Sequence, residues 1–298
     1  MSKPSPKVLI IGSDGSIGSH LRAYLESQGR EVIGTTRRPG RVGDSCLYLD
    51  LAGDVEAWHV PEDVAAAVIC AGISSVQACA IDPDGTADVN VHATVTLAKL
   101  LASAGYPKIF FLSSSHVFDG ERPLESADAR LSPVTEYGRQ KADAERRLAS
   151  LGNTIAIVRL SNVLTPHNPL IRGWTESLQA GQAIKPFSDM TMAPVPVSFV
   201  SHALAAIIDQ PTGRVWQISG ATDVSYSNAA RLGARALGMP QKLVQPIKAA
   251  EAGFEETVRR YTSMDSSRLS NELGLKPPDV DRTVELAFTN PSALGSVR

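Results

Sequence analysis

Short apolar runs alternate along the first 160 residues with segments whose apolar positions recur at helical spacing. A run of this kind predicts a buried strand, and the spacing predicts a helix packed on the sheet. Helices are expected after Gly18, over 84–104 and over 136–148, and strands are expected over 8–11, 31–35, 46–49, 65–70, 108–112 and 154–158. The alternation predicts an α/β fold, a doubly wound parallel sheet of the Rossmann type.

The pattern changes after Leu160. Residues 162–169 are rich in turn formers, and prolines interrupt 184–197, which therefore cannot form a central strand. Helices are expected over 170–180, 199–209 and 226–237, and a strand over 214–219. We expect a nucleotide-binding domain over 1–165, to which 197–222 returns, and a smaller, partly interleaved C-terminal substrate lobe over 166–298.

A glycine-rich turn follows the first apolar run. Gly12 permits a tight turn, Gly15 lets a pyrophosphate approach the backbone, and Gly18 lets the next helix pack closely. The amides that open this helix face the anion. A turn that only joins strand to helix is the alternative. The predicted cofactor contacts in this turn are Gly12, Asp14, Gly15, Ser16, Ile17 and Gly18.

The second predicted strand ends in Thr35-Thr36-Arg37-Arg38. A cofactor with a free ribose 2′-hydroxyl would meet Asp or Glu there, and no carboxylate follows this strand. Two guanidinium groups can bind a 2′-phosphate through charge-assisted bonds. The segment indicates NADP(H) over NAD(H), with a solvated basic turn as the alternative.

Further cofactor contacts are expected where other strands end, because ligands bind beyond the carboxyl ends of parallel strands. The Asp50 carboxylate can accept a hydrogen bond from an adenine amino group. Small residues after the fourth strand let a cofactor lie against the chain. The predicted contacts are Thr36, Asp50, Leu51, Cys70, Ala71 and Gly72.

Tyr137 and Lys141 are four residues apart on a predicted helix and so project from one face. A free tyrosine, with a pKa of about 10, exchanges protons poorly at neutral pH. A fixed ammonium nearby favours the phenolate, and it can also bind a cofactor ribose. Ser114, at the end of the fifth strand, can polarise a carbonyl that meets the Tyr137 hydroxyl. A solvated tyrosine–lysine pair is the alternative.

Composition narrows the partners. The chain is 43% hydrophobic and 20% charged, with a net charge of −2, which argues against nucleic acid or an anionic membrane as a partner. No apolar run reaches the length that spans a bilayer, and the segment 1–7 lacks the apolar core of a signal peptide, so a cytoplasmic protein is expected. Cys46, Cys70 and Cys79 lack metal-site or redox-motif spacing, and we expect no metal. A homodimer is the default expectation.

The glycine-rich turn, the serine after the fifth strand and the tyrosine–lysine pair together resemble the short-chain dehydrogenase/reductase superfamily, and the length and second lobe resemble its extended branch. Residues 113–120, SSSHVFDG, and 264–269, MDSSRL, are similar to blocks of the dTDP-4-dehydrorhamnose reductase family. The resemblance implies that Ser114, Tyr137 and Lys141 are catalytic, with Asn90 as a structural, proton-relaying asparagine. Ser115 and His116 replace the Asp and Tyr of that family.

Substrate contacts are expected from Ser115, His116 and Asn162. His116 either lines the substrate pocket or only closes the strand. The resulting hypothesis is an NADPH-dependent reductase of a nucleotide-linked 4-ketosugar. A NAD-dependent sugar-nucleotide epimerase and a non-catalytic NADP-binding regulatory subunit are the alternatives.

Overall fold

The structure is a computed structural model that describes residues 7–254 and 258–296. The segment 1–7, expected to lack a signal peptide, lies outside them apart from Lys7. The chain forms two compact units. Unit 1 comprises the described residues of 1–117, 135–159 and 201–216, and unit 2 those of 118–134, 160–200 and 217–298. No sequence pattern singles out 118–134 as part of the second unit.

Within the described residues a seven-stranded sheet is centred on unit 1, in the order β10-β6-β5-β4-β1-β2-β3. The pairs β1–β2, β1–β4, β2–β3 and β4–β5 are parallel, with Val8 opposite Val32 and Ala66. The predicted doubly wound Rossmann sheet is confirmed. Its strands are β1 (Lys7–Ile11), β2 (Val32–Thr36), β3 (Cys46–Tyr48), β4 (Val64–Ile69), β5 (Ile109–Ser114), β6 (Ile155–Leu160) and β10 (Val215–Ile218).

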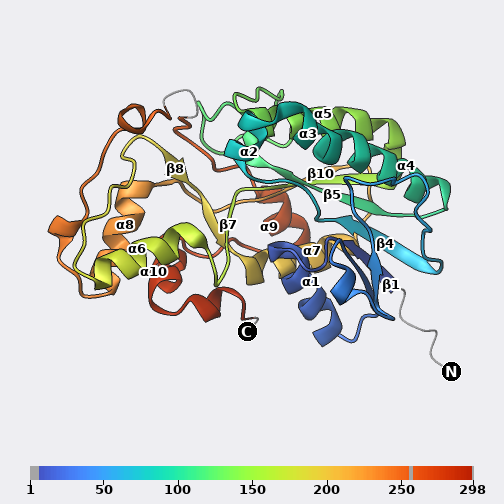
Figure 1. The fold of residues 1–298 in the computed structure, drawn as a ribbon, viewed down its shortest axis with the longest axis horizontal. Helices are drawn as coiled ribbons and strands as arrows, with labels where there is room; N and C mark the ends of the chain where they lie inside the picture. Colours follow the sequence, from blue (N-terminus) through green and yellow to red (C-terminus); the bar gives the residue numbers. More distant parts are fainter. Residues whose placement is uncertain (1–6, 255–257, 297–298) are drawn as a thin grey trace. The chain divides into compact units, whose positions relative to one another are not determined.

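Helices cover both faces of this sheet (Figure 1). One face carries α1 (Ser16–Ser27) and α7 (Val197–Ile208), whose Tyr24 and His202 rings lie 5.7 Å apart. The other face carries α2 (Val76–Ile81), α3 (Pro83–Ala87), α4 (Thr94–Ser103) and α5 (Glu136–Leu148).

The predicted helix over 84–104 is helical without a gap, but its hydrogen-bonding pattern changes in the middle. A π-helical segment, η2 (Asp88–Ala93), separates α3 from α4 and contains Asn90. The apolar positions on either side of the segment still recur at helical spacing, so the sequence indicates a helix without revealing its π-helical turn.

The core of unit 1 explains why the strands appear as apolar runs. Leu9, Ile69 and Phe111 are fully buried in the central strands, and Leu101 of α4 packs in the same cluster. Parallel strands with helices on both faces have no solvent side, so polar residues do not alternate along them.

Unit 2 is built around α6 (Pro169–Gln179), α8 (Tyr226–Ala236) and α10 (Val280–Thr289), which pack together. Trp174 of α6 stacks on Phe288 with ring centroids 6.4 Å apart and meets the Tyr226 ring edge-on, as a packing residue. The other elements are α9 (Ser267–Leu273), the parallel pair β7 (Asn162–Leu164) with β9 (Pro194–Pro196), and the antiparallel pair β8 (Thr191–Met192) with β11 (Val224–Ser225).

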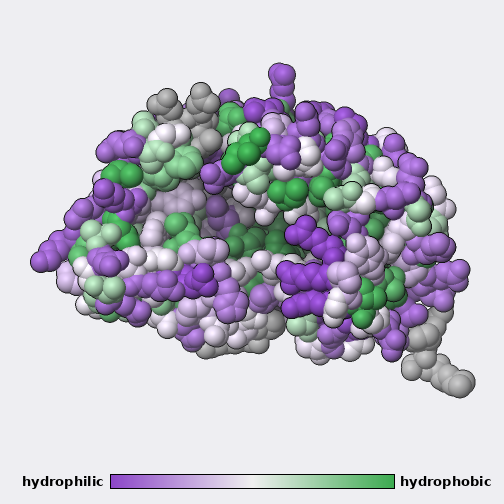
Figure 2. Space-filling model, in the orientation of Figure 1, coloured by the Kyte–Doolittle hydropathy of each residue, from purple (hydrophilic) through white to green (hydrophobic). Residues whose placement is uncertain are grey.

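Short helical turns complete the described chain. They are η1 (Pro39–Arg41), η3 (Ser115–Val117), η4 (Ala149–Thr154), η5 (Gln241–Leu243), η6 (Ala249–Ala252) and η8 (Pro291–Leu294). On the face seen in Figure 2, hydrophilic side chains predominate on the surface of each unit and hydrophobic ones form small groups among them. None of the described helices combines the length and apolar character that crossing a membrane requires.

Candidate active site

The glycine-rich turn has the geometry that its sequence predicts. Gly12 adopts a φ of +81°, and a Cβ there would lie 3.0 Å from Ala71. A Cβ on Gly18 would lie 2.3 Å from the Gly12 carbonyl oxygen, closer than any side chain tolerates. The first glycine therefore permits the turn, and the third lets α1 begin against it.

The N-terminus of α1 has no competing side chain. Gly15 is its N-cap, no side-chain cap is present, and the first turn contains no acidic residue. The first amides of a helix have no intrahelical acceptor, so those of Ser16, Ile17 and Gly18 are available to an anion. This cradle fits the pyrophosphate of a dinucleotide.

Backbone hydrogen bonds join the carboxyl ends of four strands. The Ala71 amide donates to the Ile11 carbonyl, and the Leu49 amide to the Thr36 carbonyl, each at 3.0 Å. Between these strands, the Ser13 amide donates to the Thr35 carbonyl at 3.0 Å. The edge thus brings together the predicted cofactor contacts Gly12–Gly18, Thr36–Arg38, Asp50–Leu51 and Cys70–Gly72.

The end of β2 differs from the prediction in one respect, because a carboxylate lies there. It belongs to Asp14 of the glycine-rich turn, whose Oδ2 accepts a hydrogen bond from the Thr36 hydroxyl at 2.9 Å. The Arg38 Nε lies 3.5 Å from the same oxygen. No carboxylate follows β2 in the sequence, and the one found here comes from another turn of the chain.

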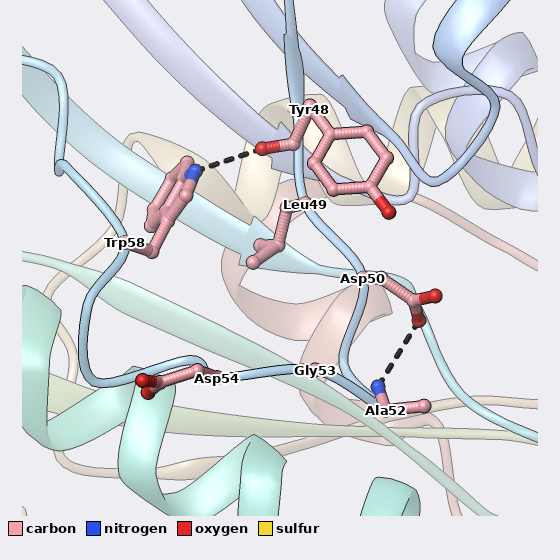
Figure 3. A pocket seen from close by; sticks show the side chains of 7 residues that line it. All are labelled: Tyr48, Leu49, Asp50, Ala52, Gly53, Asp54 and Trp58. Carbon is pink, nitrogen blue, oxygen red and sulfur yellow. Dashed lines mark hydrogen bonds between the residues drawn. The ribbon is translucent and has the colours of Figure 1, made fainter.

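Asp50 lines a cavity of about 200 Å³ beyond the end of β3 (Figure 3). Its Oδ1 accepts a hydrogen bond from the Ala52 amide at 3.0 Å, and the indole of Trp58 donates to the Tyr48 carbonyl at 2.9 Å. Leu51 lines an adjoining cavity with Asp88 and His92. One Asp50 oxygen is thus committed to the turn. Its contact with an adenine stays a prediction.

Lys141 lies deep in unit 1. It is 6% exposed, and its ammonium donates to the Leu112 carbonyl at 2.9 Å. The ammonium also lies 4.5 Å from the centre of the Phe111 ring and 6.0 Å from that of the buried Tyr137. The pair is therefore not solvated, which removes the alternative interpretation of this spacing.

Burial lowers the pKa of Lys141 to about 8, and the Glu145 carboxylate opposes that shift. Burial raises the pKa of the nearby Cys70 thiol to about 12, so this thiol stays neutral. The site therefore contains a buried ammonium that is charged at neutral pH and exchangeable slightly above it.

Asn90 holds the chain after β4. Its Oδ1 accepts from the Ile73 amide at 2.7 Å, and its Nδ2 donates to the Ile73 carbonyl and to Gln140 Oε1 at 2.9 and 2.8 Å. A Cβ on Gly72 would lie 3.1 Å from Asn90 Oδ1 and 3.8 Å from Lys141 Nζ. The amide therefore lies beside Lys141 with a structural task. Its predicted proton-relay role stays a prediction.

Ser114 ends β5, and its Oγ accepts a hydrogen bond from the His116 amide at 3.2 Å. The His116 ring meets the Tyr137 ring edge-on, with centroids 5.4 Å apart, and its Nδ1 lies 3.3 Å from the Thr135 hydroxyl. Thr135 is the N-cap of α5 and accepts from the Gly138 amide. The end of β5 and the start of α5 thus bring His116 and Tyr137 together.

Two residues of this site escaped the sequence analysis. Glu145 of α5 binds Arg159 of β6 in a buried ion pair, 2.8 Å between Oε2 and Nη2, and accepts from the Ser113 hydroxyl at 2.5 Å. Gln140 joins Asn90 to the Thr86 hydroxyl and the Pro83 carbonyl. Glu145 follows Lys141 by four residues, a spacing that marks a shared helix face.

The remaining predicted residues are less informative. Ser115 is buried in η3. Asn162 belongs to unit 2, where its Oδ1 accepts from the Ala193 amide and the Thr262 hydroxyl, each at 3.2 Å. Their contact with a substrate stays a prediction. In the part of the chain that the structure describes, no cluster of three or more His, Cys, Asp or Glu could hold a metal ion.

The model of the RmlD substrate binding domain family matches residues 6–291. The chain belongs to this family. A probable low-salt glycan biosynthesis reductase of Haloferax volcanii is 25% identical over 298 residues, covering 95% of this chain and 99% of that protein. A dTDP-4-dehydrorhamnose reductase of Mycobacterium tuberculosis is 25% identical over 286 residues, covering 93% and 90%.

Among solved structures, the dTDP-4-dehydrorhamnose reductase of Bacillus anthracis, in complex with NADP, superposes with a TM-score of 0.84 at 20% identity, covering 95% of this chain and 99% of that one. The fold of the RmlD substrate binding domain family therefore extends over the chain. The predicted resemblance to the extended short-chain dehydrogenase/reductase superfamily is confirmed, and so is the predicted class, an NAD(P)-dependent oxidoreductase.

Proposed function

We propose that this protein is an NADPH-dependent reductase of a nucleotide-linked 4-ketosugar. Two relatives that align along more than nine-tenths of the chain are named as reductases, one of them as dTDP-4-dehydrorhamnose reductase. A similarly folded reductase was solved with NADP. The name of that reductase supports a ketone at C4 of a nucleotide-linked sugar as the group reduced here.

Residues of unit 1 would hold the cofactor. The amides of Ser16 and Ile17 would bind the pyrophosphate, and Arg37 and Arg38 would bind the 2′-phosphate. The Lys141 ammonium would hold a ribose hydroxyl. When bound, NADPH supplies the hydride that the ketone carbon receives.

Tyr137 would provide the proton. Its phenol would donate a proton to the ketone oxygen while the carbonyl carbon receives a hydride, so that ketone, hydride and proton together yield a secondary alcohol. The Ser114 hydroxyl would donate a hydrogen bond to the same oxygen as negative charge develops there. The phenolate left on Tyr137 is stabilised by the Lys141 ammonium and is reprotonated from solvent.

The observation that carries this proposal is the burial of the Lys141 ammonium one helical turn from Tyr137, beside the strand end that contains Ser114. A lysine in a protein interior is costly unless its charge is used or compensated. The carbonyl of Leu112 and the Phe111 ring hold the ammonium in place. A phenolate that forms and disappears during turnover needs such a fixed charge.

Removal of the Tyr137 hydroxyl group tests the proposed proton transfer. Tyr137→Phe is expected to lower kcat by about 10²–10⁴-fold, because general acid catalysis contributes factors of that size. NADPH affinity, measured by nucleotide fluorescence, should stay nearly unchanged. The assay follows the loss of NADPH absorbance when dTDP-4-dehydrorhamnose is added as the substrate. This compound appears in the names of the related reductases.

The matched control is Tyr106→Phe, which also removes a buried tyrosine hydroxyl. Tyr106 donates to the Pro61 carbonyl at 2.7 Å and has no contact with the proposed site among the described residues. Its replacement should leave kcat within a factor of two or so of the wild-type value. A Tyr137→Phe protein that retained full turnover would remove the proposed mechanism.

A further inference from the structure

The carboxylate of Asp14 lies where a ribose 2′-substituent would be recognised. It comes from the glycine-rich turn, between Gly12 and Gly15, and reaches the end of β2 through its contacts with Thr36 and Arg38. Its side chain is 18% exposed, so it is not completely removed from solvent.

These contacts form a closed ring. The Arg38 amide donates to the Thr36 hydroxyl at 3.0 Å, and that hydroxyl donates to Asp14 Oδ2. The Arg38 side chain returns to the same carboxylate with its Nε. Because Thr36 is 1% exposed, the ring is anchored on a buried hydroxyl, and the carboxylate has a defined position.

The ring of contacts between Asp14, Thr36 and Arg38 places a negative charge beside the arginines at the end of β2. A carboxylate only accepts hydrogen bonds, so it can receive a ribose 2′-hydroxyl but repels a phosphate dianion. It also neutralises part of the Arg38 charge that a 2′-phosphate would use. Arg37 is exposed, and no hydrogen bond or ion pair of its side chain is found within residues 7–254 and 258–296. One arginine therefore favours the phosphate, while Asp14 favours the hydroxyl.

We propose that Asp14 is a specificity-determining residue that allows the site to bind NADH as well as NADPH. It reduces the preference of the site for NADPH over NADH. The inference rests on the proposed function, since it concerns the cofactor of the same site. The sequence around β2 alone points to NADP(H), whereas the structure adds an acceptor suited to the unphosphorylated ribose.

The test is the ratio of the dissociation constants of NADH and NADPH, measured by titration of the full-length protein. Asp14→Asn keeps the size of the side chain and removes its charge. Affinity for NADPH should rise and affinity for NADH should fall, so that the ratio shifts toward NADPH by about tenfold. The gain in NADPH affinity should shrink at high salt, which screens the phosphate.

Asp143→Asn is the control for a change in net charge. Asp143 is also paired with arginines, Arg146 and Arg147, but lies on the outer side of α5. Its replacement should leave the ratio unchanged. An unchanged ratio in Asp14→Asn, or an equal loss of both affinities, overturns the proposal, because Asp14 would then only shape the turn.

The titration, together with the assay of NADPH consumption, separates this inference from the proposed reductase activity. A shifted ratio in a protein that reduces no 4-ketosugar would support the role of Asp14 and contradict the proposed function. If the wild-type protein reduces the ketone and the ratio of the NADH and NADPH dissociation constants does not change in Asp14→Asn, the proposed function is supported and the role of Asp14 is contradicted. A wild-type protein that binds neither nucleotide overturns both.

Discussion

Lys141 shows at the scale of one residue how burial sets chemistry. Its ammonium is almost completely removed from water, and burial brings its pKa to about 8 from an ordinary value of 10.5. The Leu112 carbonyl and the Glu145 charge favour the protonated form, and the loss of hydration exceeds their effect. The residue is therefore charged at neutral pH with a small margin.

This margin predicts the pH dependence of turnover. The proposed chemistry needs the ammonium, so kcat should fall as pH rises through about 8. Lys141→Met, which keeps the length of the chain without the charge, should have low activity and no such limb. The measurement is kcat against pH for both proteins. A wild-type rate that stays constant well above pH 8 would contradict the assignment.

Stability should change in the opposite direction. Below pH 8 Lys141 is charged in the folded and unfolded chain, and the cost of its burial lowers stability in full. Between about 8 and 10.5 the unfolded chain binds more protons, so this residue makes the free energy of unfolding rise with pH. Across that range the thermal midpoint of the wild type should rise relative to that of Lys141→Met, and parallel curves would show that the lysine is not buried in solution.

The helix α5 is the element that positions both Tyr137 and Lys141, and its attachment to the sheet is polar. Glu145 binds Arg159 of β6 and Ser113 of β5, so one carboxylate fastens the helix to two strands. Gln140 ties the same helix to Asn90 and Thr86. Apolar packing alone leaves a helix free to shift along a sheet, whereas directional bonds fix its rotation.

Removing that attachment should be costly. Glu145→Gln leaves the Arg159 guanidinium buried without a charge partner, and we expect the free energy of unfolding to fall by about 3–5 kcal/mol. Asp143→Asn on the exposed side of the same helix should cost about 1 kcal/mol or less. Denaturant unfolding of the three proteins measures the difference, and an equal effect of the two substitutions would refute the structural role of Glu145.

The close contact of Gly18, the third residue of α1, with the glycine-rich turn leads to a second prediction. A Cβ on Gly18 would lie 2.3 Å from the Gly12 carbonyl oxygen, so Gly18→Ala must move the helix from the turn. Loss of stability and loss of nucleotide affinity should follow together. Gly173 in α6 has open space around it, and Gly173→Ala should stabilise the protein by about 0.5–1 kcal/mol through helix propensity. Thermal unfolding and NADPH titration check both, and a harmless Gly18→Ala would contradict the packing described.

At the scale of the whole molecule, patterns local in the chain were predictable and contacts between distant segments were not. The bounds expected for α5 agree with the structure at both ends, because apolar spacing and the cap Thr135 lie within one segment. The buried strands were equally evident. The π-helical segment around Asn90 was not, since the apolar positions on either side of it still indicate an ordinary helix.

The site followed the same division. The spacing of Tyr137 and Lys141 is local, and so is that of the glycines. The contact between Asp14 and Arg38 arises because β1 and β2 are neighbours in the sheet, and the bonds of Glu145 arise because α5 lies over β5 and β6. The spacing of residues in the sequence does not predict either of these contacts. These contacts decide which charges are present and how they are held.

The most direct test of the proposed activity is to follow the hydride itself. NADPH deuterated at the transferable position is supplied with dTDP-4-dehydrorhamnose, and the sugar product is analysed by mass spectrometry and NMR. One deuterium is expected on the new carbinol carbon, and one NADP⁺ should form for each alcohol. An altered sugar without deuterium and without net oxidation of NADPH would contradict it and favour an epimerase that recycles its own cofactor.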